Sequence, residues 1–159
     1  MRKFLLIAAV LAALGGPASA TNVIVLADEP GGLLGPAILK YQQLNSSGAQ
    51  VQLKGSCTSA CVMVTGIVRN LCAWPGTVLR IHAAHVRGDT GTKSDSNTEL
   101  MVSHFAPGVR AWAQRSGALK SVEFKNVAAS AVGIRPGRCT NRAVTDHPPD
   151  ETAQKGPTG

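Results

Sequence analysis

The chain has 159 residues, of which 44% are hydrophobic and only 16% charged, and its net charge is +7. A chain of this length fits one small domain. Its basic residues are scattered and its aromatic content is 4%, so it lacks the basic, stacking surface of a nucleic-acid-binding domain.

The first twenty residues have the pattern of a secretory signal peptide. Arg2 and Lys3 form a basic start, residues 4–14 are apolar, and residues 18–20 (ASA) are a small-residue cleavage site. The apolar run is shorter than the roughly 18 residues that a membrane-spanning helix needs. We expect cleavage after residue 20, a periplasmic or secreted mature protein, and no membrane contact.

Strands alternate with helices in the front two-thirds of the mature chain. Residues 21–27 indicate a buried strand, residues 33–44 an amphipathic helix and residues 49–55 a second strand. Residues 58–68 are apolar enough for a buried helix, and a third strand runs into His82. This alternation predicts an α/β fold of repeated β-α units with a mostly parallel sheet.

The rest of the chain has weaker signals. Residues 86–97 form a polar loop, and residues 99–116 form one or two helices broken near Pro107. We predict a short helix over residues 126–132 and a short strand before the last cysteine. Residues 140–159 have almost no apolar residues, which is typical of a disordered tail.

All four cysteines lie in the predicted domain, residues 21–139. In an exported protein an even number of cysteines argues for two disulfides. Four cysteines allow three pairings, and the short separation of Cys57 and Cys61 favours a bridge across a strand-to-helix turn, which leaves Cys72 with Cys139. A zinc site is the alternative, but no C-x2-C pair is present. We expect no metal and no other cofactor.

Three predicted strand ends carry residues suited to acyl transfer. The first strand runs into Pro30-Gly31-Gly32, the second into Ser59 and the third into His82. Active groups of α/β proteins gather at the carboxyl ends of parallel strands. A serine nucleophile needs a base for its proton, and the oxyanion needs accessible N–H groups. Taken singly, these features also fit a tight turn, a helix N-cap and a core histidine.

This order of motifs resembles the proteolytic subunit of Clp-type proteases, within the ClpP/crotonase-like fold. That family carries Pro-Gly-Gly after a strand, then a serine that opens a helix, then Ile-His at the next strand end. Here these are segments 30–32, 59–60 and 81–82. The resemblance implies that Ser59 is the nucleophile and His82 the general base. It further implies an oxyanion hole made by the N–H groups of Gly31, Gly32 and Ala60.

The chain departs from the family's pattern where the third catalytic residue would be. The family has an aspartate downstream of the histidine, but residues 116–139 contain none. Glu123 is the only acid there, a couple of positions off register, so it is the candidate orienting acid. The strand and helix that precede Pro-Gly-Gly in the family are also missing.

These residues favour an exported serine hydrolase or peptidase-like protein with a Ser-His pair. The alternative is a non-catalytic periplasmic binding or scaffold protein that retains the ClpP/crotonase-like fold. The reduced sheet predicts a homo-oligomer. A periplasm holds no ATP-driven unfoldase, so no ATPase partner is expected, and the substrate is an unspecified peptide or acyl compound.

Overall fold

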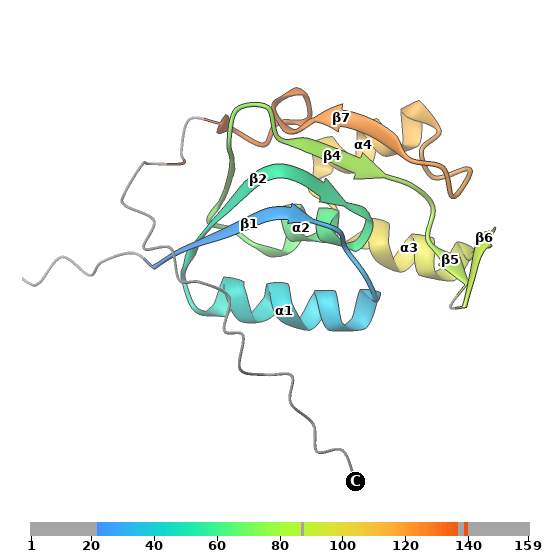
Figure 1. Ribbon diagram of the computed structural model, residues 1–159, viewed down its shortest axis with the longest axis horizontal. Helices are drawn as coiled ribbons and strands as arrows, with labels where there is room; N and C mark the ends of the chain where they lie inside the picture. Colours follow the sequence, from blue (N-terminus) through green and yellow to red (C-terminus); the bar gives the residue numbers. More distant parts are fainter. Residues whose placement is uncertain (1–21, 87, 137–138, 140–159) are drawn as a thin grey trace, which may run out of the picture.

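The computed structural model describes residues 22–86, 88–136 and 139 (Figure 1). Four strands of its main sheet follow the order β1 (Val23–Glu29), β2 (Gln50–Thr58), β4 (Val78–Ile81) and β7 (Lys125–Ala128). A fifth strand, β3 (Leu71–Ala73), pairs with β2. All pairings in this sheet are parallel except that between β4 and β7. The prediction of a small α/β domain with a mostly parallel sheet is confirmed.

The helices follow the strands as crossovers. α1 (Leu34–Ser46) joins β1 to β2 and lies on the same side of these strands as α2 (Val64–Ile67), as Figure 1 shows. A 3-10 turn, η1 (Ser59–Met63), leads from β2 into α2. The later helical elements are α3 (Asp95–Ser103), α4 (Pro107–Ser116) and the 3-10 turn η2 (Ala129–Val132).

β2 is the central strand and carries much of the core. Val51 and Leu53 are fully buried in the hydrophobic cluster. Between them, Gln52 points to the opposite face because side chains alternate along a strand, and it is also buried. Its Oε1 accepts a hydrogen bond of 2.9 Å from Trp74 Nε1. β2 is therefore covered on both faces at this point.

A bulge near the end of β1 ties this strand to β2. The register between the two strands shifts between Ala27 and Glu29, and Asp28 adopts a left-handed backbone conformation with φ +46°. Its Oδ1 accepts hydrogen bonds from the Ser56 N–H (2.9 Å) and the Ser56 hydroxyl (3.2 Å). The carboxyl ends of the two strands are thus held together just before the segments that follow them.

The predicted helices of the first two-thirds are found with small shifts. α1 buries Ala37 and Tyr41, but Leu33, which we predicted as part of its apolar face, precedes the helix and is 56% exposed. Residues 58–68 form η1 and α2 rather than one helix. The predicted break at Pro107 is confirmed, because this proline starts α4.

Three predicted elements differ from the structure. The helix predicted over residues 126–132 is β7 followed by η2. β7 supplies the antiparallel partner of β4 and buries Val127 against the core, so tertiary pairing outweighs local preference. The predicted loop over residues 86–97 contains the hairpin β5 (His85–Val86) and β6 (Asp89–Lys93), and α3 begins within it. The predicted strand before Cys139 is not formed by residues 133–136.

Both predicted disulfides are present. Cys57 pairs with Cys61, with a Cα–Cα distance of 5.3 Å, and Cys72 pairs with Cys139, with a distance of 5.6 Å. The cysteines are therefore engaged with one another rather than with zinc, and two disulfides fit an oxidising compartment. Among the described residues, no helix is long and apolar enough to cross a membrane. The predicted signal peptide and tail lie outside the described residues.

Candidate active site

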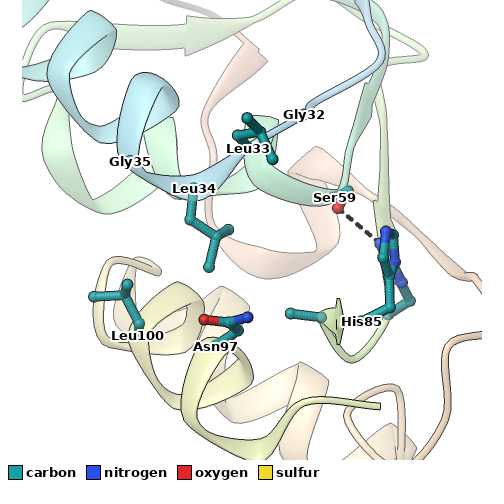
Figure 2. A pocket seen from close by; sticks show the side chains of 10 residues that line it. Gly32, Leu33, Leu34, Gly35, Ser59, His85, Asn97 and Leu100 are labelled. Carbon is teal, nitrogen blue, oxygen red and sulfur yellow. Dashed lines mark hydrogen bonds between the residues drawn. The ribbon is translucent and has the colours of Figure 1, made fainter. Parts of the chain in front are cut away.

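The three strand ends singled out from the sequence meet at one edge of the sheet. β1 and β2 run in parallel, with Glu29 opposite Cys57, and β2 and β4 run in parallel, with Thr58 opposite Arg80. The segments that follow β1, β2 and β4 therefore leave the sheet side by side. They contribute Gly32, Ser59 and His82 to the wall of one pocket (Figure 2).

Ser59 and His82 form a hydrogen bond across this edge. The Ser59 Oγ lies 2.7 Å from His82 Nε2, within the reach expected of a nucleophile and its base. Thr58 occupies the N-cap position of η1 and makes no side-chain cap. Because the Ser59 hydroxyl points at His82 rather than capping the helix, the N-cap interpretation of this serine is not supported.

The backbone of Ser59 is in an uncommon conformation. Its φ is +56°, in the left-handed region, which costs an L-residue with a side chain about 1–2 kcal/mol. The preceding Thr58 is extended, with φ −111° and ψ 136°. The chain therefore turns sharply at Ser59 and presents its side chain to the pocket. Such conformations persist only where the surroundings hold them, and they cluster at functional sites.

The glycine pair lets the end of β1 approach this turn. Gly31 has φ +89°, and a Cβ placed on it would overlap the Thr58 carbonyl oxygen and lie 3.0 Å from the Ala60 nitrogen. Gly32 has φ +134°, and a Cβ there would meet no atom within 4 Å, so its backbone borders the open pocket. Gly31 thus allows close backbone packing, whereas Gly32 lines the pocket and is the better placed of the two glycines for an oxyanion contact. Ala60, the third predicted contributor, is fully buried next to Gly31 and does not line the pocket.

His82 is in an environment that favours its neutral form. It is 3% exposed, and burial lowers the pKa of its imidazole below 6.5, with a further contribution from nearby His85. The backbones of Ala83 and Val122 act on this pKa in the opposite sense. A lowered pKa leaves the ring neutral at pH 7, which is the form that can accept a proton from serine.

No side chain in the described part of the chain accepts a hydrogen bond from the other ring nitrogen of His82. Nδ1 is buried and makes no hydrogen bond of normal geometry within the described part of the chain. The Phe124 ring packs over the imidazole instead, with centroids 4.5 Å apart. Glu123, the predicted orienting acid, is exposed and does not fill this role. An orienting acid could have been predicted only if a recognisable motif marked its position, and the sequence contains no such motif.

A cavity of about 340 Å³ opens in front of the Ser59–His82 pair. Its far wall includes Asn97 and Leu100 of α3 (Figure 2), which are three residues apart and therefore share a helix face. Leu34 at the start of α1 and His85 of β5 complete the wall. The sequence did not single out Asn97 or Leu100, because a helix stripe alone does not tell which helix faces a pocket.

The rim of this cavity is apolar and open to solvent. Leu33 and Leu100 line it and are 56% and 43% exposed. These two side chains leave part of the apolar lining of the cavity open to solvent. In the described part of the chain, no cluster of three or more His, Cys, Asp or Glu residues is arranged to hold a metal ion.

No model of a known protein family matches this chain, and no curated protein matches it either. The interpretation of the site therefore depends on its own geometry. A hydroxyl hydrogen-bonded to a neutral imidazole, beside glycine-bounded backbone and an open cavity, meets the requirements of nucleophilic attack on a carbonyl carbon.

Proposed function

We propose that this protein is an exported serine hydrolase that acts on peptide or other acyl substrates. The observation that carries the proposal is the 2.7 Å contact between Ser59 Oγ and His82 Nε2, made by a serine in the left-handed conformation at the end of a parallel strand. The parallel strands and the order of the three strand ends also support a ClpP/crotonase-like fold.

In the proposed reaction Ser59 Oγ attacks the acyl carbon, and its proton passes to His82 Nε2. The N–H groups of Gly32 and Ala60 stabilise the oxyanion. The bond from the acyl carbon to the leaving group then breaks, and the leaving group takes the proton from His82. Water, deprotonated by His82, hydrolyses the acyl-enzyme and restores Ser59. Because Nε2 accepts the serine proton, the neutral ring must carry its own proton on Nδ1.

The test is covalent labelling by a fluorophosphonate, which forms an Oγ–P bond with an activated serine and releases fluoride. We expect mass spectrometry to find the label on Ser59 of the oxidised protein. Ser59→Ala and His82→Ala should each abolish labelling. Ser103→Ala and His104→Ala are matched controls, because they change the same residue types outside the pocket, and they should label like the wild type. An unlabelled wild-type protein that is folded would contradict the proposal.

A second candidate is a binding or scaffold protein that has lost the chemistry. The observation that favours it is that no acid side chain among the described residues pairs with Nδ1 of His82, because loss of the orienting acid costs about 10⁴-fold in kcat in serine proteases. This candidate requires that Ser59→Ala leave ligand binding intact. Loss of function in Ser59→Ala at unchanged melting temperature would rule it out.

Export to the periplasm is part of the first proposal. The two disulfides support an oxidising compartment, and residues 1–20 have the sequence pattern of a signal peptide. Protein recovered from the periplasm should then begin at Thr21 by mass. Homo-oligomerisation stays a prediction, which light scattering of the purified protein would test.

A further inference from the structure

Ser59 lies at the centre of the smaller disulfide loop. Cys57 and Cys61 are two residues before and two residues after it, and their Cα atoms are 5.3 Å apart. Both cysteines are buried, with exposed fractions of 1% and 0%. The bridge therefore fixes the distance between the last residues of β2 and the first turn of η1, which are the two ends of the turn that presents Ser59.

The conformation inside this loop is one that the chain would not adopt unaided. At φ +56° Ser59 is in a region that residues other than glycine avoid. A change to negative φ would reorient the Cα–Cβ bond and move Oγ out of hydrogen-bond distance of His82. Gly31 packs against one side of the turn, and the Cys57–Cys61 disulfide links the two ends of the turn.

We propose that the Cys57–Cys61 disulfide is a positioning element that holds Ser59 in its left-handed conformation and so keeps Oγ against His82 Nε2. The catalytic consequence rests on the proposed hydrolase function, whereas the geometric one does not. Cys57 and Cys61 touch no reacting atom in this scheme and act through the serine between them.

The second disulfide offers a comparison within the same protein. Cys72 and Cys139 are 67 residues apart, whereas Cys57 and Cys61 are only 4 apart. The entropy that a cross-link removes from the unfolded chain grows with loop length. The long loop should therefore dominate stability, and the short loop should dominate the geometry of Ser59. Because both Cys57 and Cys61 are buried, we expect reductants to reach this disulfide poorly.

The experiment compares Cys57→Ala/Cys61→Ala with the control Cys72→Ala/Cys139→Ala. For each we would measure the rate of fluorophosphonate labelling of Ser59, the melting temperature, and the ¹⁵N resonances of the His82 imidazole. We expect the first variant to label about 10- to 100-fold more slowly, as misplacement of a reacting group by about 1 Å does. Its Nε2 resonance should move to that of a ring without the serine hydrogen bond. The control should keep the wild-type rate and resonance while losing more melting temperature.

Three outcomes would overturn the proposal. The first is a wild-type labelling rate and His82 resonance in Cys57→Ala/Cys61→Ala. The second is an equal loss of labelling in both variants. The third is failure to fold at 25 °C of both this variant and Cys57→Val/Cys61→Ala, which keeps more of the buried volume, because the bridge would then support the whole core. If wild-type protein does not label at all, the hydrolase proposal fails, and the His82 resonance alone decides whether the disulfide positions Ser59.

Discussion

His82 is held where its charged form is disfavoured, and this has a direct effect on pH dependence. Only the neutral ring can accept the serine proton, so labelling of Ser59 should fall as pH drops through the pKa of His82. Burial and His85 lower this pKa, so the midpoint should lie below 6.5. His85→Ala removes the charge contribution and should shift the midpoint upward. A rate profile of labelling from pH 4 to pH 8, with folding checked by circular dichroism, measures both.

A midpoint at or above 6.5 would contradict this account of His82. It would mean that an acceptor reaches Nδ1 in solution and stabilises the imidazolium. Glu123 would be the first residue to test in that case, and a Glu123→Gln variant would lower the midpoint again.

Gly31 is the glycine whose replacement should damage the site most. Its φ of +89° is strained for any other residue, and an alanine Cβ would overlap the Thr58 carbonyl. We expect Gly31→Ala to lower the free energy of unfolding by about 2–4 kcal/mol and to slow labelling of Ser59. Gly48→Ala is the matched control, because Gly48 also has positive φ (+68°) but has open space around it.

Gly48→Ala should lower the free energy of unfolding by only about 1 kcal/mol, because it adds the conformational cost of a positive φ without a steric clash. Urea unfolding measures both values, and the labelling rate of each variant is measured below its transition. Equal costs for the two glycines would show that the end of β1 can move away from the turn at Ser59, and the close packing there would then be unimportant.

At the scale of secondary-structure elements, the Cys72–Cys139 disulfide is the feature that we expect to contribute most clearly to stability. It links β3 to the end of the described domain over a separation of 67 residues, and the chain-entropy model assigns such a loop about 4 kcal/mol. Cys72→Ala/Cys139→Ala should therefore lower the free energy of unfolding by about this amount in urea titrations. A loss below about 1 kcal/mol would mean that the unfolded chain is already compact between these residues.

The elements predicted from sequence are those with several apolar residues in a regular pattern, and among them β2 is the most deeply buried. β1, α1 and β2 have apolar patterns that match their periods, and the turn at Ser59 has its own cysteine markers. β7 (KNVA) has only two apolar residues and β6 (DTGTK) has none, so neither has a pattern to detect. Their places are decided by pairing with β4 and β5, which is not visible along the chain.

The residues of the candidate site also differ in whether the sequence predicts them. Ser59, His82 and the glycine pair were predictable because parallel strands bring their carboxyl ends to one edge. Asn97 was not, because its place on the pocket wall depends on how α3 packs. The sequence itself shows that no aspartate is present where the family has its third catalytic residue. It does not show that the Phe124 ring covers His82, because this contact follows from the pairing of β7.

At the scale of the whole molecule, two kinds of segment form the pocket: the ends of buried strands and the less deeply packed segments around them. Ser59 and His82 directly follow Thr58 and Ile81, the last residues of β2 and β4, and both of these residues are buried. The pocket wall comes from the segment after β1, from β5 and from α3. In the proposed hydrolase, the strands would hold the reacting groups, and the less deeply packed segments would define what can enter the pocket.

This division matters most at Leu33 and Leu100. Both line the cavity, yet more than two-fifths of each is open to solvent, so neither contributes much to the core. For the proposed hydrolase, exchange of these two surface side chains should change substrate preference while the sheet and its cross-links, and therefore the ability to fold, stay as they are.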